Sequence, residues 1–393
     1  MVHNAPLMKK TDAGTAYGRK RGATNTALTE TGPGTRMGEL LRRYWHPIGL
    51  SGDAGATPKR VRVLSEDLIL FRAGDGQPGL VYPRCTHRGT SLYYGRVEER
   101  GIRCCYHGWL FDAQGRCLEQ PFEPNPRFKD KVRQPWYPLE ERYGLIFAYM
   151  GPPRRKPVLP RWDVLENLAP GEFIEADDNM MSGHKLLPCS WTHHLDNIPD
   201  HYHVPVLHGQ ISGTQFVDAM ARVPEIRWEL TEHGINTIAV RRLDDGKRFR
   251  RIDEGILPTV RVIPDPGVSR YGQSESVSWL LPVDDTSYML YAAIRKTPGW
   301  QRAKTRPGGK LWSEMTEAEH QRYPDDYEAQ VGQGALTLHS EEHLGATDKG
   351  VIMLRKLLLK QADTVARGKN PLGVRFDPRD ALVKTHAGNF LDA

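Results

Sequence analysis

The sequence has 393 residues, of which 39% are hydrophobic and 26% charged, a composition typical of a globular protein with room for two domains. Because it contains no run of about eighteen apolar residues and no apolar secretory core within residues 1–29, we predict no membrane span and a cytoplasmic location. The net charge of +6 is modest, and basic residues are interspersed with acidic ones without a nucleic-acid-binding motif. No nucleic-acid partner is therefore expected.

The first part of the chain predicts an arm followed by a small β domain. Residues 1–31 are expected to form a flexible or loosely docked arm, and Gly32-Pro33-Gly34 then opens a short helix over Met37–Tyr44. Residues 32–153 are expected to form the β domain, because short β-rich runs are bounded there by Gly, Asp and Pro. These runs are Arg60–Leu64, Leu68–Arg72, Gly79–Pro83, Gly108–Asp112 and Tyr143–Tyr149.

Two Cys-His pairs lie within this β domain in the pattern C-x-H-x16-C-x2-H. The first pair is Cys85 and His87, and the second is Cys104 and His107. Two thiolates on one iron and two imidazoles on the other are the ligands of a [2Fe–2S] centre with a potential of roughly −150 to +300 mV. A structural zinc site is the alternative, but zinc sites usually pair like with like, as C-x2-C followed by H-x3-H. The pattern therefore favours the iron–sulfur cluster.

The chain has five cysteines, and the cluster would use two of them. Cys105, Cys117 and Cys189 remain, an odd number without the spacing of a disulfide framework. We expect free thiols in a reducing cytoplasm.

The cluster motif, ending in Tyr106-His107-Gly108-Trp109, resembles that of the Rieske non-haem iron oxygenases, large (catalytic) subunit. The resemblance runs from about Gly32 to Lys360, and the segment Gly32–Pro47 is similar to the phthalate-dioxygenase-like branch. It implies an α+β fold, with an N-terminal β-rich Rieske domain and a C-terminal antiparallel sheet covered by helices and holding a mononuclear iron.

The second half of the chain shows the mixed pattern that this fold requires. The Pro-rich, basic segment 151–157 predicts a linker, so the second domain is expected over residues 154–393. Trp300–Arg322 is polar and predicts an insertion or lid-like segment, and Thr347–Arg367 predicts a long amphipathic helix with Gly368 as its stop. The strand-like runs, expected to form an antiparallel sheet, are Ile235–Val240, Val260–Ile263, Val277–Pro282 and Tyr288–Arg295.

A second candidate metal motif lies at residues 196–208. Asn197, Asp200 and His203 follow one another at intervals of three, which on a helix places them on one face. Pro205 should end or kink that helix and let His208 turn back toward His203. Two His and one carboxylate would form the face of a non-haem Fe(II) site, which leaves the opposite positions open for O2 and substrate. A solvated, His-rich helix end is the competing interpretation.

The spacing D-x2-H-x4-H of Asp200, His203 and His208 matches the family's motif. The resemblance implies that the two histidines bind iron. It also implies that Asp200, which we predict to be catalytic together with Asn197, is hydrogen-bonded to a ligand histidine and links it to the cluster of a neighbouring subunit.

Spacing alone leaves the third iron ligand open among the acids of the C-terminal half. The segment around Asp326-Tyr327-Glu328 resembles the family's segment that carries the distant ligand aspartate, which implies Asp326. An exposed, acidic helix N-terminus is the competing interpretation. The acids considered are Asp325, Asp326, Glu328, Glu341 and Glu342.

We therefore expect an oxygenase component that passes electrons through a [2Fe–2S] cluster to a mononuclear Fe(II) and activates O2. Because the sequence has no Rossmann, flavin or C-x4-C-x2-C motif, a separate NAD(P)H-dependent reductase, ferredoxin or both must supply the electrons. An electron-transfer protein is the remote alternative, but it would leave the second half of the chain unused.

The resemblance implies hydroxylation or O-demethylation of a small aromatic, carboxylate-bearing substrate, with a cis-dihydroxylating phthalate-type dioxygenase as the alternative. It also implies a homo-oligomer, typically a trimer. An anionic substrate needs a cation in its pocket. The candidates that follow the iron motif are Arg222, Arg227, Arg261 and Arg270.

Overall fold

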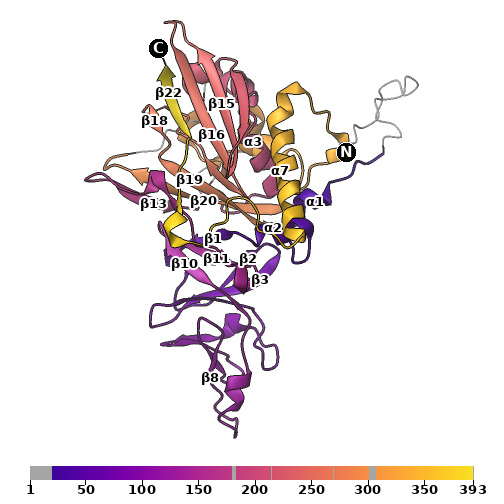
Figure 1. Cartoon of the computed structure of the whole chain (residues 1–393), viewed down its shortest axis with the longest axis vertical. Coiled ribbons are helices and arrows are strands. Elements are labelled where there is room, and N and C mark those ends of the chain that lie inside the picture. Colours follow the sequence, from indigo (N-terminus) through magenta and orange to yellow (C-terminus); the bar gives the residue numbers. More distant parts are fainter. Residues whose placement is uncertain (1–19, 179–182, 214, 269, 301–306, 393) are drawn as a thin grey trace.

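The computed structural model describes residues 20–178, 183–213, 215–268, 270–300 and 307–392, which form two lobes along the long axis of the molecule (Figure 1). The lower lobe in this view is built from short strands, and the upper lobe from a large antiparallel sheet with helices beside it (Figure 1). The predicted α+β fold, with a β-rich N-terminal part, is confirmed. Within the described ranges, no helix has the length and apolar character needed to cross a bilayer.

Two four-stranded antiparallel sheets make the lower lobe. The first has the order β2-β3-β4-β9 and the second the order β5-β6-β7-β8. Buried side chains, among them Ile69, Phe71 and Phe111, give this lobe an apolar core of its own. The strands are β2 (Lys59–Val63), β3 (Glu66–Arg72), β4 (Pro78–Val81), β5 (Arg96–Glu98), β6 (Gly101–Arg103), β7 (Leu110–Phe111), β8 (Cys117–Glu119) and β9 (Trp136–Tyr137).

A three-stranded sheet joins the two lobes, with β11 (Leu145–Tyr149) between β1 (Trp45–Leu50) and β10 (Leu139–Arg142). All five residues of β11 are buried, and they belong to the main core together with residues of the upper lobe. For example, Phe147 packs edge-on against Trp279 with ring centroids 5.5 Å apart. This sheet is therefore packed as part of the upper lobe.

The upper lobe is organised around a nine-stranded sheet with the path β13-β20-β19-β17-β16-β15-β14. β19 and β20 are buried along most of their length, as expected when both faces of a sheet are covered. β22 brings the C-terminal segment back to pair with β16 and β18, and β12 (Arg161–Trp162) pairs with β21 (Leu382–Val383). The strands of the large sheet are β13 (Phe173–Asp177), β14 (Glu225–Leu230), β15 (Gly234–Arg242), β16 (Arg248–Ile256), β17 (Val260–Val262), β18 (Gly272–Gln273), β19 (Ser276–Asp284), β20 (Ser287–Lys296) and β22 (Gly388–Asp392).

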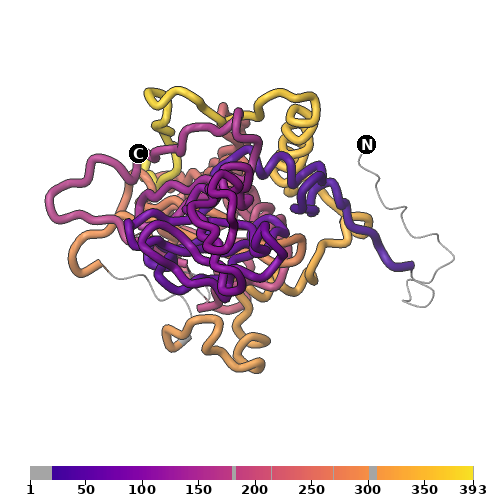
Figure 2. Tube along the Cα trace, turned by 90° about the horizontal axis from the view of Figure 1, so that it is seen from below, coloured from indigo at the N-terminus to yellow at the C-terminus, as the bar shows by residue number. Residues whose placement is uncertain are grey.

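The helices lie beside this sheet. The longest, α7, ends where Gly368 adopts a φ of +72°, a conformation that glycine reaches without steric cost, so the predicted stop is confirmed. α7 lies next to α2, which comes from the start of the chain (Figure 2). The helices are α1 (Thr26–Thr29), α2 (Arg36–Leu41), α3 (Trp191–Asn197), α4 (His203–Val206), α5 (Glu317–Arg322), α6 (Asp326–Val331) and α7 (Lys349–Ala366).

Some predicted segments differ from the structure. α2 ends at Leu41, because the chain turns there to enter β1 at Trp45. The described end of the arm is not loose, since Ala23 donates its N–H to Ser340 Oγ at 2.7 Å and accepts from the Ser340 N–H at 3.1 Å. The linker is also held in place, because Pro157 accepts a hydrogen bond from the Trp45 indole at 2.9 Å. The described part of the predicted insertion, 307–322, consists of short 3₁₀ turns and α5.

Arg355 of α7 bridges two acids, Asp196 of α3 at 2.6 Å and Glu342 at 2.7 Å. All three side chains are less than a quarter exposed. Arg355→Ala would leave Asp196 buried without its cation, so we expect the free energy of unfolding to fall by about 3–5 kcal/mol in denaturant titrations of the upper lobe. The matched control is Arg36→Ala, since the Arg36–Asp363 pair also involves α7 but is exposed. It should cost less than about 1 kcal/mol, and equal costs for the two variants would contradict the prediction.

Candidate metal centres

The two candidate cluster loops have the same backbone hydrogen bonds. In each loop the cysteine N–H donates to the carbonyl five residues on, and the N–H four residues on donates back to the cysteine carbonyl. These distances are 2.8 and 2.8 Å in the loop of Cys85, and 2.9 and 3.1 Å in the loop of Cys104. The residues four positions on are Gly89 and Gly108, with φ of +80° and +71°, where a Cβ would be strained. The two loops are therefore structural copies with a cysteine at the same place.

The side chains of the two loops separate into a buried pair and an outer pair. Cys85 and Cys104 are buried, and burial, with a contribution from the neighbouring Cys104 sulfur, raises the pKa of the Cys85 thiol to about 12. His87 and His107 are half-buried, with ring centroids 4.5 Å apart, and Trp109 stacks on His87. Two inner sulfurs and two outer imidazoles fit a [2Fe–2S] cluster with one iron on each pair.

Gln134 supports the first loop and was not predicted from the sequence. Its side chain is fully buried, accepts the Thr86 N–H at 2.9 Å and donates to the carbonyls of Tyr82 and Arg84 at 2.8 and 2.9 Å. Because Gln134 lies far from Cys85 in sequence, no local pattern identifies it.

We expect Gln134→Leu to leave these three backbone groups without partners. At about 1 kcal/mol for each lost hydrogen bond, the lower lobe should be destabilised by roughly 2–4 kcal/mol. The visible cluster absorbance per chain should fall with it. Gln114→Leu, an exposed glutamine of the same lobe, is the control and should change neither quantity. Normal absorbance and stability in Gln134→Leu would refute the supporting role.

The second candidate motif does not lie on one helix, so this part of the prediction is wrong. α3 ends at Asn197, and α4 begins only at His203. Pro199 has no N–H with which to continue the bonds of α3. Asp200 lies in the connecting segment, where its carboxylate accepts the Tyr202 N–H at 2.9 Å.

Pro205 also acts differently from the prediction. It is the third residue of α4, in the first turn, where a missing N–H costs no helical hydrogen bond. The chain continues into a π-helical turn, Leu207–Ile211, whose bonds span five residues. This wider turn allows His203 and His208, which are five residues apart, to face each other with ring centroids 5.3 Å apart.

Asp326, the first residue of α6, completes the group. Its Oδ1 lies 3.6 Å from His203 Nε2 and 3.5 Å from His208 Nε2. The donor atoms of these three residues lie within 4.8 Å of one another, and in the described part of the chain they are the group placed to hold a metal ion. Two imidazoles and one carboxylate on one side of a site fit Fe(II).

The other candidate acids have different partners. Asp325 caps α6 and lies 3.4 Å from the Nδ1 of His208, on the side of the ring away from Asp326. Glu328 accepts the Asp325 N–H, Glu341 accepts the Gly22 N–H, and Glu342 pairs with Arg355. Asp326 is thus the carboxylate that meets both Nε2 atoms.

The outer nitrogens of both histidines face acceptors. His203 Nδ1 lies 3.4 Å from Asp200 Oδ2, and His208 Nδ1 donates to Gln215 Oε1 at 2.6 Å. These acceptors favour the tautomer with a free Nε2, which a metal requires. Asn197 donates to Asp326 Oδ1 at 3.0 Å. Gln215, like Gln134, was not predicted from the sequence. Its side chain meets His208 only because the chain turns back after the π-helical segment.

The charges of the group are strongly coupled. Burial lowers the pKa of His208, but Asp326 outweighs this effect and raises it to about 9. The two histidines in turn hold the pKa of the Asp326 carboxyl well below its usual range, although burial opposes this. A metal ion that bound here at neutral pH would therefore have to replace a proton on His208.

A chain of buried hydrogen bonds extends from Arg261 to the helix of Asp326. Arg261 donates to His194 Nε2, so His194 Nδ1 donates to the Tyr288 hydroxyl at 2.8 Å. Tyr288 donates in turn to Gln330 Oε1 at 3.0 Å. Gln330 is on α6, one turn after Asp326. This series of hydrogen bonds therefore connects the helix that carries the Asp326 carboxylate to the sheet.

Of the four arginines predicted to bind substrate, the structure brings one near the metal group. Arg261 is buried, and its charge acts on Asp326. The other three lie on the surface, each paired with an acid. Arg222 pairs with Asp244, Arg227 with Glu229, and Arg270 with Glu275.

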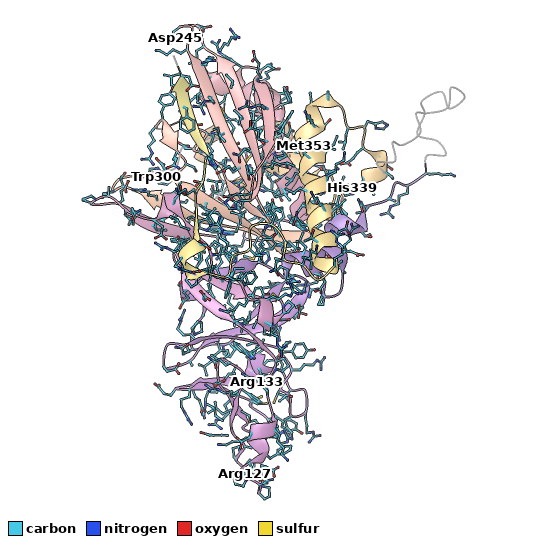
Figure 3. All side chains as sticks on the ribbon, in the orientation of Figure 1. Arg127, Arg133, Asp245, Trp300, His339 and Met353 are labelled. Carbon is cyan, nitrogen blue, oxygen red and sulfur yellow. The ribbon has the colours of Figure 1, made fainter. Side chains whose placement is uncertain are left out.

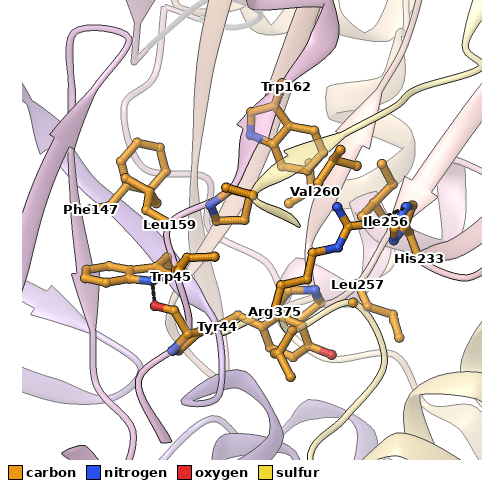
Figure 4. Close-up of a pocket in the computed structure, with 18 of the residues that line it drawn as sticks. Tyr44, Trp45, Phe147, Leu159, Trp162, His233, Ile256, Leu257, Val260 and Arg375 are labelled. Carbon is orange, nitrogen blue, oxygen red and sulfur yellow. Dashed lines mark hydrogen bonds between the residues drawn. The ribbon is translucent and has the colours of Figure 1, made fainter. Parts of the chain in front are cut away.

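A cavity with largely apolar walls is separate from both groups (Figure 4). Trp45 and Phe147 from the joining sheet form one wall, and Val260 and Trp279 from the large sheet form another. Val260 precedes Arg261 in β17, and neighbouring strand residues point to opposite faces. The cavity therefore lies across the sheet from the metal group, at the seam between the lobes.

Comparison with known proteins agrees with the two cofactors that these groups of residues fit. A family model described as Rieske [2Fe-2S] domain matches residues 44–137. The phenoxybenzoate dioxygenase subunit alpha of Ectopseudomonas oleovorans is 46% identical, over 99% of this chain and 97% of that protein. The 5,5'-dehydrodivanillate O-demethylase oxygenase subunit of Sphingobium sp. is 33% identical, over 90% and 83%.

The fold is also found in solved structures. Dicamba monooxygenase bound to 3,6-dichlorosalicylic acid is 17% identical with a TM-score of 0.60, over 83% of this chain and 98% of that one. NdmA of Pseudomonas putida CBB5 is 19% identical with a TM-score of 0.57, over 84% and 94%.

These findings define an oxygenase with a Rieske cluster. The chain belongs to the Rieske non-haem iron oxygenases, as a large, catalytic subunit. The predicted family, enzyme class and cofactors, a [2Fe–2S] cluster and Fe(II), are confirmed.

Proposed function

We propose that this oxygenase component hydroxylates or O-demethylates an aromatic substrate that carries a carboxylate. The cluster would be held by Cys85, His87, Cys104 and His107, and Fe(II) by His203, His208 and Asp326. The convergence of the last three side chains in a chain that also has the cluster loops carries the proposal. When bound, the cluster supplies electrons one at a time and Fe(II) activates O2.

The protein's own residues orient the iron ligands. Gln215 and Asp200 face the Nδ1 atoms, so both rings present Nε2 to the site. Asn197 fixes Asp326 Oδ1 by a hydrogen bond. Three protein ligands on one side leave positions open for O2 and for a substrate held beside the iron.

The substrate class rests on the names of relatives and on the buried cations near the site. Relatives over most of the chain are named for phenoxybenzoate, 5,5'-dehydrodivanillate and phthalate, and one of them is an O-demethylase. Dioxygenation is the second candidate, because the relative at 46% identity is named a dioxygenase. A neutral alcohol is a weaker candidate, although a tert-butanol monooxygenase is 36% identical.

The electrons would come from a separate NAD(P)H-dependent reductase or ferredoxin. Arg127 lies at the tip of the lower lobe and Arg133 farther up the same lobe, and both residues are exposed (Figure 3). Exposed cations near the cluster would attract an acidic redox protein and speed its association. All five cysteines are unpaired, which supports a cytoplasmic location.

We also propose a homo-oligomer, typically a trimer. The cluster loops belong to the lower lobe, whereas α3 and the metal group belong to the upper lobe (Figure 1). Electrons would reach the iron more directly across a subunit interface, from His107 of one subunit to Asp200 of the next. Both side chains are partly exposed, and a carboxylate can accept hydrogen bonds from imidazoles on two sides.

The test of function uses holoenzyme with a suitable reductase, NADH and phenoxybenzoate. The wild type should contain three irons per chain and consume O2 with release of a hydroxylated or demethylated product. His208→Ala should keep the cluster's EPR signal, lose one iron and reduce turnover to background, because the remaining donors cannot retain Fe(II). His386→Ala, an exposed histidine, is the control and should behave as wild type. Full turnover by His208→Ala would exclude this iron site.

The oligomer is tested by complementation. Cys104→Ser and His203→Ala should each be inactive alone. Co-expressed, they should form mixed oligomers in which an intact cluster faces an intact iron site, so activity should return. The result must be compared with mixed purified homo-oligomers that do not exchange subunits. No recovery in mixed oligomers verified by mass would confine electron transfer to one chain.

A further inference from the structure

The large sheet carries a group of buried charges beside the metal group. In the register of β15 and β16, Arg241 lies opposite Phe249, and Ala239 lies opposite Arg251. Residues two apart in a strand share a face, so Arg241 and Arg251 point to the same side of the sheet, and Asp253 points there too. The three charged residues are at most 6% exposed.

This face of the sheet meets the segments that carry the proposed iron ligands. Asp253 Oδ2 accepts a hydrogen bond from His201 Nε2 at 2.8 Å, two residues before His203. Phe249 packs in one apolar cluster with Val204 of α4 and with Phe216. The ring of Phe216 lies 4.5 Å from that of His208. Arg241 thus lies on the same face as Phe249, next to the apolar cluster that contacts His208.

The charges of this group do not cancel. Arg251 already has partners for both Nη atoms, because it donates to Asn389 Oδ1 at 3.0 Å and to the Pro264 carbonyl at 2.8 Å, and its Nε lies 3.0 Å from Asp253. Two guanidinium groups and one carboxylate leave a net charge of about +1 in a buried place, which is costly without an anion.

Arg241 is the arginine of this group whose two Nη atoms are both free. Its Nε donates to the Arg222 carbonyl at 2.9 Å, which fixes the plane of the guanidinium. Its Nη1 and Nη2 have no hydrogen-bond partner in the part of the chain that the structure describes, although the side chain is only 1% exposed. Burial, with repulsion from Arg251, lowers the pKa of Arg241 to about 10, so the group remains charged at neutral pH.

We propose that Arg241 binds the carboxylate of the substrate through Nη1 and Nη2, an inference that rests on the proposed function. Two parallel N–H donors on one edge of a guanidinium match the two oxygens of a carboxylate. The bound anion would cancel the excess charge, and its aromatic ring would lie against Phe249 and Phe216 toward the iron ligands. Arg241 would then determine specificity for acids over neutral aromatic compounds.

The test compares Arg241→Met with Arg242→Met in the iron-loaded holoenzyme. Arg242 is the next residue of β15, its side chain is exposed, and it takes no part in either metal group, so it is a matched control. The probes are phenoxybenzoate and its neutral amide. For each, the thermal unfolding midpoint and the KM are measured with and without the substitution.

In the wild type, the acid should raise the unfolding midpoint and the amide should not. Arg241→Met should abolish that shift and raise the KM for the acid by about 100-fold or more, with little change for the amide. Without ligand, it should be at least as stable as the wild type, because a buried unpaired charge is removed. Arg242→Met should match the wild type throughout.

An unchanged KM and midpoint shift for the acid in Arg241→Met would overturn the proposal. So would a large loss of stability and of cluster absorbance, which would mark a structural role. If Arg241→Met does not fold, Arg241→Lys is used instead, because lysine keeps the charge but loses the paired donors. An unchanged KM for the acid in Arg241→Lys would also overturn the proposal.

Failure of the proposed function has a different signature. If the wild type consumes no O2 with the acid, yet the acid still stabilises it in an Arg241-dependent way, the proposed reaction fails and the anion site stands. If the wild type oxidises the acid and Arg241→Met does so equally well, the reaction stands and the anion site fails.

Discussion

The close contact of the Asp326 carboxylate with His203 and His208 is the interaction on which the arrangement of the site in the upper lobe depends. A carboxylate at 3.5–3.6 Å from two Nε2 atoms in a largely buried place is unfavourable unless its charge is matched. The matching charge is a proton on His208 in the metal-free protein, and Fe(II) would take that place in the holoenzyme. The segments 197–208 and 326–330 are therefore held against each other by electrostatics as well as by packing.

The surrounding hydrogen bonds give this meeting a single geometry. The series of hydrogen bonds from Arg261 through His194 and Tyr288 to Gln330 has a single donor-to-acceptor direction, because arginine can only donate and the amide oxygen can only accept. It connects β17, α3, β20 and α6, which are distant in sequence. At the Nδ1 atoms of the two histidines, Gln215 faces His208 and Asp200 faces His203, and these contacts orient the two imidazole rings. Such a connected network favours one arrangement of the core over its alternatives.

The two lobes use different physical means to hold their groups. In the lower lobe, backbone geometry dominates, since two loops repeat the same turn around a positive-φ glycine. In the upper lobe, side chains from separate elements converge, and their charges must be balanced by partners or by a ligand. The unpaired donors of Arg241 accordingly occur beside the metal group, where a bound substrate carboxylate would neutralise the excess positive charge.

The sequence by itself determined the features whose residues are near one another along the chain. The cluster pattern of Cys85, His87, Cys104 and His107 belongs to two short loops within one small domain, and the strands followed from local composition. The spacing of His203 and His208 also marked a metal motif. It did not reveal how they meet, because the break at Pro199 and the π-helical turn depend on packing against the sheet.

Tertiary structure alone decided which distant residues complete each group. Five acids were candidates for the third iron ligand from the sequence, and only the position of α6 brings Asp326 to both imidazoles. Gln134, Gln215 and Arg241 gave no local signal, and three of the four predicted arginines lie on the surface. Along a strand such as β15, Arg241 and Arg242 are equivalent in sequence. Which of the two is buried depends on which face of the sheet meets α4 and the segment before it, and the fold as a whole sets that face.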